Sequence, residues 1–110
     1  MGREDRMEEV VVFISASDED EAAKIARALV GDRLAGCVNI IKNIRSIYTW
    51  QGQIEDEKEA LMIVKTQKSL FDSLVKKVKE LHSYTVPEII ALPIIEGYKD
   101  YLNWLTGVTG

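Results

Sequence analysis

Residues 36–66, GCVNIIKNIRSIYTWQGQIEDEKEALMIVKT, form the stretch that decides the fold. Apolar residues recur there at mostly even spacing before Gln51 and Gly52 and again after them, which is typical of two β-strands joined by a tight turn. Gly52 takes a positive φ without steric cost, as such a turn requires. The alternation is blurred at residues 41–43, so a bulge is expected at that point.

These two strands are too long for one small domain to cover. Each would hold about 13 to 16 residues and extend about 45–50 Å, whereas a domain of about 100 residues is about 35 Å across. The hairpin tip is therefore expected to overhang its own subunit with four apolar residues exposed: Ile47, Tyr48, Trp50 and Ile54. Such residues promote aggregation unless another chain covers them, so the hairpin predicts self-association.

The residues before the hairpin predict a buried strand and a helix. Residues 9–16, EVVVFISA, form a nearly continuous apolar run, typical of a central strand that is buried on both faces. Ser17 or Asp18 is expected to cap a helix that runs to about Arg33. The apolar face of this helix is expected to consist of Ala22, Ile25, Ala26, Leu29 and Val30.

The residues after the hairpin predict two more helices and one more strand. Residues 71–81 have apolar positions at helical spacing, and residues 89–95 are typical of an edge strand because they contain Pro93. Residues 98–105 predict a short final helix. This order predicts an α+β, ferredoxin-like βαββαβ fold with a long protruding β-hairpin and a short C-terminal helix.

Composition and charge exclude several classes of function. The formal net charge is −4 with no basic run, which argues against nucleic acid and against an anionic membrane surface as partners. No apolar run approaches the roughly 18 residues of a membrane-spanning helix. The single cysteine cannot form an internal disulfide, so a cytoplasmic location is expected. We expect one domain over residues 1–110, with residues 1–6 as a loose polar end.

Three functions known on this fold lack their residues in this chain. Residues 15–19, SASDE, are acidic where an acylphosphatase-type site needs arginine. A soft-metal chaperone needs a Cys-x-x-Cys pair, and the chain has one cysteine. An RNA-recognition module needs aromatic residues on its central strands, where the first strand offers only Phe13.

The residues that stand out each have a structural and a functional interpretation. Cys37 is either a small core residue or a metal ligand, and His82, the only histidine, is either a helix-end residue or a metal ligand. For Tyr48 and Trp50, packing in an interface is the preferred interpretation. Residues 55–59, EDEKE, fit a solvated strand edge or a weak site for a hard cation.

Lys65 and Glu88 are expected beside the ends of the second helix, where a cleft could form.

The number of available ligands limits any metal site. A closed metal site needs three or four Cys, His or carboxylate ligands, and one subunit supplies one Cys and one His. A tight site within one chain is therefore not expected, although a symmetric oligomer could assemble one from several subunits.

Six motifs follow one another over about residues 8–106. They are Ala35-Gly36-Cys37-Val38-Asn39, Tyr48-x-Trp50-x-Gly52-x-Ile54, Glu59, Lys65-Thr66, His82-x-Tyr84-x-x-Pro87-Glu88 and Tyr101-Leu102-x-Trp104-Leu105. Together these motifs closely resemble those of the CutA divalent-cation-tolerance proteins. The chain departs from that family at two positions, since Ile14 stands where some members carry cysteine and Ser83 replaces the usual proline.

The resemblance implies a cytoplasmic homotrimer with an architecture similar to that of the PII signalling proteins. It implies a role in tolerance of copper and other divalent metals, no established catalytic activity, no required cofactor, and room for a protein partner of unknown identity. By position, it implies metal binding at Cys37 and His82. It also implies a cleft between subunits formed by Tyr48, Trp50, Glu59, Lys65, Tyr84 and Glu88.

These inferences lead to one functional hypothesis and two alternatives. The hypothesis is a trimeric, non-enzymatic metal-response protein in which His82, with Glu88 or Glu59, binds Cu(II) or another divalent cation weakly at the intersubunit cleft. The first alternative is a PII-like sensor of a small anionic metabolite or nucleotide, with Lys65 contacting the anion. The second is an enzyme with Glu88 and His82 as an acid/base pair, for which the residues suggest no substrate.

Overall fold

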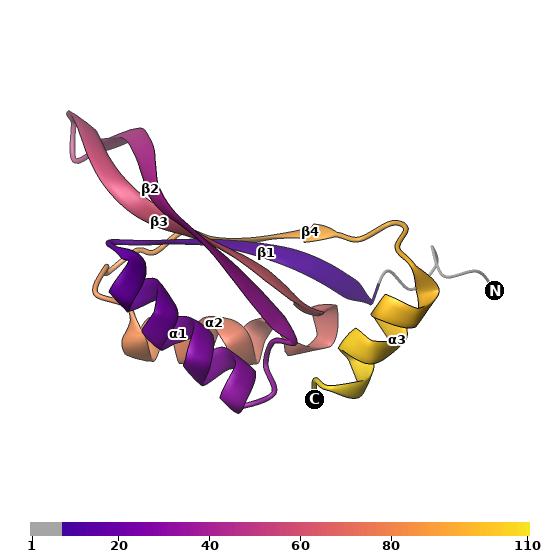
Figure 1. Cartoon of the computed structure of the whole chain (residues 1–110). Coiled ribbons are helices and arrows are strands. Elements are labelled where there is room, and N and C mark those ends of the chain that lie inside the picture. Colours follow the sequence, from indigo (N-terminus) through magenta and orange to yellow (C-terminus); the bar gives the residue numbers. More distant parts are fainter. Residues whose placement is uncertain (1–7) are drawn as a thin grey trace.

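The computed structural model describes residues 8–110, so the loose end predicted for residues 1–6 lies outside the described part of the chain. Residues 8–110 form a four-stranded antiparallel sheet in the order β2-β3-β1-β4, with α1 and α2 against one face (Figure 1). The elements are β1 (Glu9–Ala16), α1 (Glu19–Gly31), β2 (Cys37–Trp50), β3 (Gln53–Gln67), η2 (Lys68–Leu70), α2 (Phe71–Leu81), β4 (Ile89–Pro93) and α3 (Lys99–Gly107). The predicted α+β order βαββαβ with a terminal helix is confirmed.

The β2–β3 turn has the geometry that its sequence predicts. Gln51 and Gly52 have positive φ angles of 52° and 80°, and they join the paired residues Trp50 and Gln53. Positive φ at both central residues defines a two-residue type I′ turn, whose twist matches that of the flanking strands. The hairpin is therefore closed tightly at its tip.

A bulge and a missing neighbour divide the hairpin into two halves. The register shifts between Ile41 and Ile44, and Asn43 has a φ of 59°, so the predicted bulge is confirmed. Within β3, only residues 60–67 pair with β1. These residues and residues 37–41 of β2 form the inner half of the hairpin. The outer half, residues 44–59, has no third strand beside it and projects beyond the sheet, as predicted (Figure 1).

The two faces of the sheet differ in what covers them. On the face of the sheet that contacts α1 and α2, alternate side chains are buried in a single core with these two helices: Val10, Val12, Ile14, Ala16, Ala60, Met62 and Val64. Neither α1 nor α2 covers the opposite face, where Val11 and Phe13 are only half-buried (Figure 1). The prediction that β1 is buried on both faces is therefore correct for one face only, because these two helices lie on the same side.

The first helix begins as predicted and ends slightly early. The Asp18 carboxylate accepts a hydrogen bond of 2.8 Å from the Glu21 N–H, which makes Asp18 the N-cap. The helix ends at Gly31 instead of about Arg33. Val30 was expected on the apolar face but is 45% exposed, because it is rotated by about 100° from the buried Leu29.

The remaining elements match the prediction apart from their ends. α2 buries Leu74 and Val78, and the edge strand β4 ends at Pro93 instead of residue 95, although the Ile94 N–H still donates to the Glu9 carbonyl of β1 at 3.0 Å. α3 buries Leu102 and Leu105 and ends two residues later than predicted. Among residues 8–110, no helix is long and apolar enough to span a membrane.

Candidate functional site

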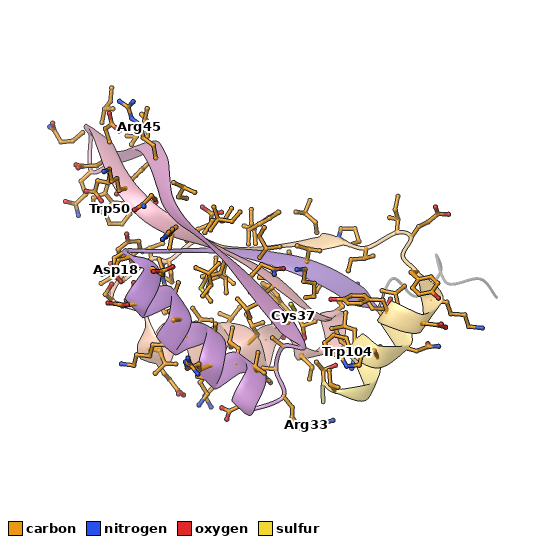
Figure 2. All side chains as sticks on the ribbon, in the orientation of Figure 1. Asp18, Arg33, Cys37, Arg45, Trp50 and Trp104 are labelled. Carbon is orange, nitrogen blue, oxygen red and sulfur yellow. The ribbon has the colours of Figure 1, made fainter. Side chains whose placement is uncertain are left out.

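A cleft of about 770 Å³ lies where the outer half of the hairpin passes the end of β1 and the segment after α2. Five of the six residues that the sequence places in an intersubunit cleft line this cleft within one chain: Tyr48, Trp50, Glu59, Tyr84 and Glu88. Trp50 projects from the outer half near the tip (Figure 2). The volume is that of a small-molecule site.

A short hydrogen bond joins the hairpin to the segment after α2. The Tyr84 hydroxyl donates to Glu59 Oε2 at 2.6 Å, and Glu59 is 7% exposed. Burial, followed by the hydrogen bond and charge of Glu59, raises the pKa of Tyr84 well above its usual range. The phenol therefore remains a donor at neutral pH, and the carboxylate keeps a fixed position in the cleft wall.

The rest of the cleft is negatively charged and aromatic. The Tyr48 hydroxyl donates to Glu57 Oε2 at 3.2 Å, and desolvation followed by the charge of Glu57 raises the pKa of Tyr48. Glu88 adds a third carboxylate to the lining, which among the described residues includes no Lys or Arg. A cleft with one sign of charge concentrates ions of the opposite sign, so this cleft favours cations.

His82 lies behind the cleft wall with both ring nitrogens engaged. Nε2 is 2.7 Å from the Ser15 carbonyl oxygen, which can only accept, and Nδ1 accepts from the Tyr84 N–H at 3.1 Å. The imidazole in this arrangement is therefore neutral with its proton on Nε2. Its side chain is fully buried and its ring packs 4.7 Å from that of Tyr84, so His82 holds Tyr84 in place and does not line the cleft.

Glu21 ties the start of α1 to the same segment. Its carboxylate accepts hydrogen bonds of 2.9 Å from both the N–H and the hydroxyl of Ser17, and one of 2.8 Å from the Ser83 N–H. Burial alone would raise the pKa of Glu21, but these hydrogen bonds outweigh it and lower the pKa from 4.5 to about 2. The carboxylate also lies 3.9 Å from His82 Nδ1.

Lys65 and Cys37 lie away from this cleft within one chain, and the prediction that Lys65 belongs to a cleft between subunits stays a prediction. The two residues are paired across the inner half, and the Lys65 ammonium donates to Asn39 Oδ1. Lys65 lies six positions along β3 from Glu59, which is about 20 Å in an extended strand.

The two predicted metal ligands are also separated within one chain. Cys37 is half-buried, with Sγ 4.0 Å from Asn39 Oδ1, at the end of the hairpin opposite to Trp50 (Figure 2). His82 instead contacts Ser15, which is paired with Leu61 of β3. Leu61 lies about 13 Å along β3 from Lys65, the residue paired with Cys37. Within residues 8–110, no three His, Cys, Asp or Glu side chains are placed to hold a metal ion. The described side chains of a single chain therefore do not fit a closed metal site.

Sequence reasoning did not single out Glu21, Ser15 or Ser83, and it named Glu57 only as part of the acidic run EDEKE, a possible weak cation site. A signal for Glu21 was present, because Asp18 and Glu21 have the spacing of a capping box. The strand register pairs Tyr48 with Glu55, and only the folded structure shows that Glu57, two residues further along β3, accepts from the Tyr48 hydroxyl. Nothing in the sequence indicates that Ser15 and Ser83 approach the same cleft.

Comparisons with known proteins agree on one family. Residues 10–108 match the family model for the CutA1 divalent ion tolerance protein. The chain is 53% identical over 102 residues to the divalent-cation tolerance protein CutA of Thermus thermophilus, covering 93% of this chain and 99% of that protein. It is 41% identical over 100 residues to Protein CutA 1, chloroplastic, of Oryza sativa, covering 91% of this chain and 56% of that longer protein.

The fold is shared with solved structures of such proteins. The structure of the divalent cation tolerance protein Cut A1 from Thermus thermophilus superposes with a TM-score of 0.91 at 52% sequence identity. The superposition covers 93% of this chain and 99% of that one. The chain therefore belongs to the CutA1 divalent ion tolerance protein family.

Proposed function

We propose that the chain assembles into a homotrimer and acts, without catalysing a reaction, in divalent-cation tolerance by binding a cation at the cleft. The observation that carries this proposal is the charge of the cleft lining, which contains Glu57, Glu59 and Glu88 and no basic residue among the described part of the chain. Because one chain does not supply a metal site, a Cu(II) or similar ion would need carboxylates from neighbouring subunits.

The uncovered apolar surfaces support self-association. Ile47 and Ile54 on the outer half are 64% and 79% exposed, and the open face of the sheet presents Ile41, Ile90 and Leu92 in exposed positions. Apolar surface of this extent is typical of an interface between subunits. A trimer that buries these residues would place the clefts next to neighbouring chains.

The two alternative functions have less support. A sensor of an anionic metabolite or nucleotide needs a cation in the cleft, and Lys65 lies about 20 Å from Glu59 along β3. An acid/base enzyme needs a histidine that reaches a substrate, whereas the His82 ring is buried with both nitrogens bonded.

Cytoplasmic location remains part of the proposal, supported by the single free cysteine.

Calorimetric titration of metal-stripped protein, combined with sedimentation equilibrium, tests the proposal. We expect a particle of about three times the 12.4 kDa chain mass that binds Cu(II) saturably and does not bind ATP. Glu88→Gln should weaken Cu(II) binding at least tenfold, whereas Glu96→Gln, an exposed glutamate outside the cleft, should not. A monomer, or binding of ATP in place of Cu(II), would show the proposal to be wrong.

A further inference from the structure

The cleft is poorly matched to a bare metal ion. Its volume of about 770 Å³ is much larger than an ion needs, and its carboxylates are spread along the wall. One oxygen of Glu59 already accepts from Tyr84, and one oxygen of Glu57 accepts from Tyr48. The chain therefore offers distributed negative charge, without a compact set of ligands.

The same lining matches a larger, softer cation. Trp50, Tyr48 and Tyr84 bring aromatic rings to the cleft, and Ile47 and Val86 add apolar surface. Aromatic faces attract ammonium groups, with tryptophan the strongest, and cages of such rings recognise quaternary ammonium ions. Carboxylates beside the rings add Coulombic attraction without requiring the ion to lose an ordered shell of water.

We propose that the cleft binds an organic ammonium ion, with its cationic group beside Tyr48, Trp50 and the Glu57 carboxylate and its apolar part against Val86. This inference rests on the proposed function, because both place a cation in the same cleft. It differs in naming a ligand that a single chain can hold. Trp50 is 42% exposed on the projecting strand, so its ring is accessible to such a ligand in one chain.

Choline provides the test, because its neutral carbon isostere, 3,3-dimethyl-1-butanol, has the same shape without the charge. The chain has two tryptophans, and Trp104 on α3 is 45% exposed and does not line the cleft. In a Trp104→Leu variant of the full chain, fluorescence therefore reports on Trp50 alone. We expect choline to change this fluorescence saturably and the isostere to bind at least tenfold more weakly.

Calorimetry on matched variants identifies the groups involved. Trp50→Leu and Glu57→Gln should each weaken choline binding at least fivefold, whereas Trp104→Leu should leave it unchanged. Trp50 and Glu57 are exposed on the outer half, and an unchanged thermal midpoint in both variants would show that folding is intact. Equal binding of choline and its isostere, or no binding of either, would overturn the inference.

Two further results separate this inference from the proposed function. If Cu(II) binds as expected and choline does not, only the ammonium inference is wrong. If Trp50 is not quenched by acrylamide in the assembled protein, a neighbouring chain closes the cleft and the inference is likewise overturned. If choline binds and Cu(II) does not, the inference is supported and the metal part of the proposed function fails.

Discussion

The inner and outer halves of the β2–β3 hairpin have the same local sequence pattern but differ in burial. Both alternate apolar and polar residues, yet Met62 and Val64 in the inner half are fully buried, whereas Ile54 and Ile47 in the outer half are mostly exposed. The difference comes from β1 and the two helices, which cover the inner half and end before the outer half begins. Period-two alternation thus defines a strand with two faces, and the neighbours of the strand decide which face is buried.

Truncation of one apolar residue in each half should give the largest contrast. Met62→Ala removes a fully buried side chain and should lower the free energy of unfolding by about 2–5 kcal/mol. Ile54→Ala, at a position 79% exposed, should cost less than about 0.5 kcal/mol within the chain. Denaturant unfolding at two protein concentrations measures both effects.

The dependence of unfolding free energy on protein concentration tests whether the outer half of the hairpin takes part in self-association. If self-association covers Ile54, the loss in Ile54→Ala should appear only where assembly contributes to stability, and sedimentation should show weaker association. The loss in Met62→Ala should be the same at both concentrations. A concentration-independent cost for Ile54→Ala equal to that for Met62→Ala would mean that the outer half belongs to the core of one chain.

Sequence patterns were sufficient for the fold because each signal in it is local. The turn at Gln51 and Gly52, the bulge near Asn43 and the cap at Asp18 each depend on residues that are neighbours in the chain. Element ends were less accurate, as at Pro93, because pairing partners decide where a strand stops. Val30 was misplaced because helical spacing alone does not show how wide a face its neighbours cover.

The site was only partly predictable because it depends on distances across the fold. Motif resemblance brought Tyr48, Trp50, Glu59, Tyr84 and Glu88 together, and the structure places all five on one cleft. Lys65 shares their motifs but lies near the other end of β3, and His82 shares them but is buried behind the wall. Residue type and order could not distinguish a side chain that lines the cleft from one that supports it.

Replacement of His82 should sharpen the contrast at the junction of the two halves. His82→Phe keeps an aromatic ring of similar size but leaves the buried Ser15 carbonyl and the Tyr84 N–H without their partner. An unsatisfied buried group costs about 1–3 kcal/mol, so we expect a loss of about 2–4 kcal/mol in the free energy of unfolding. Thermal or denaturant unfolding of metal-stripped protein measures this loss.

A paired variant separates positioning from metal ligation by His82. Tyr84→Phe keeps the backbone N–H that His82 accepts and loses only the hydroxyl bond to Glu59, so it should cost less, about 1–2 kcal/mol. If His82 instead acts as a metal ligand, His82→Phe should unfold like the unaltered protein without metal. It should then differ only in losing the stabilisation that Cu(II) provides.

Acid stability tests the link from α1 to the cleft. Hydrogen bonds from Ser17 and Ser83 outweigh the effect of burial and hold the pKa of Glu21 at about 2 in the folded chain, below its ordinary value of 4.5. A lowered pKa stabilises the fold above pH 4.5, and this stabilisation is lost as the pH falls from about 4.5 to about 2. After allowance for partial solvent access, it amounts to on the order of 2 kcal/mol.

Acid titration of the unfolding free energy should isolate this contribution. Glu21→Gln should be less stable than the unaltered chain at pH 7 and should lose less stability between pH 4.5 and 2, because its amide does not titrate. Glu19→Gln, at an exposed acid in the same helical turn, serves as the matched control and should leave the profile nearly unchanged. If both variants gave the same profile, Glu21 would not stabilise the segment that carries Tyr84, and His82 would be left as its principal anchor to the core.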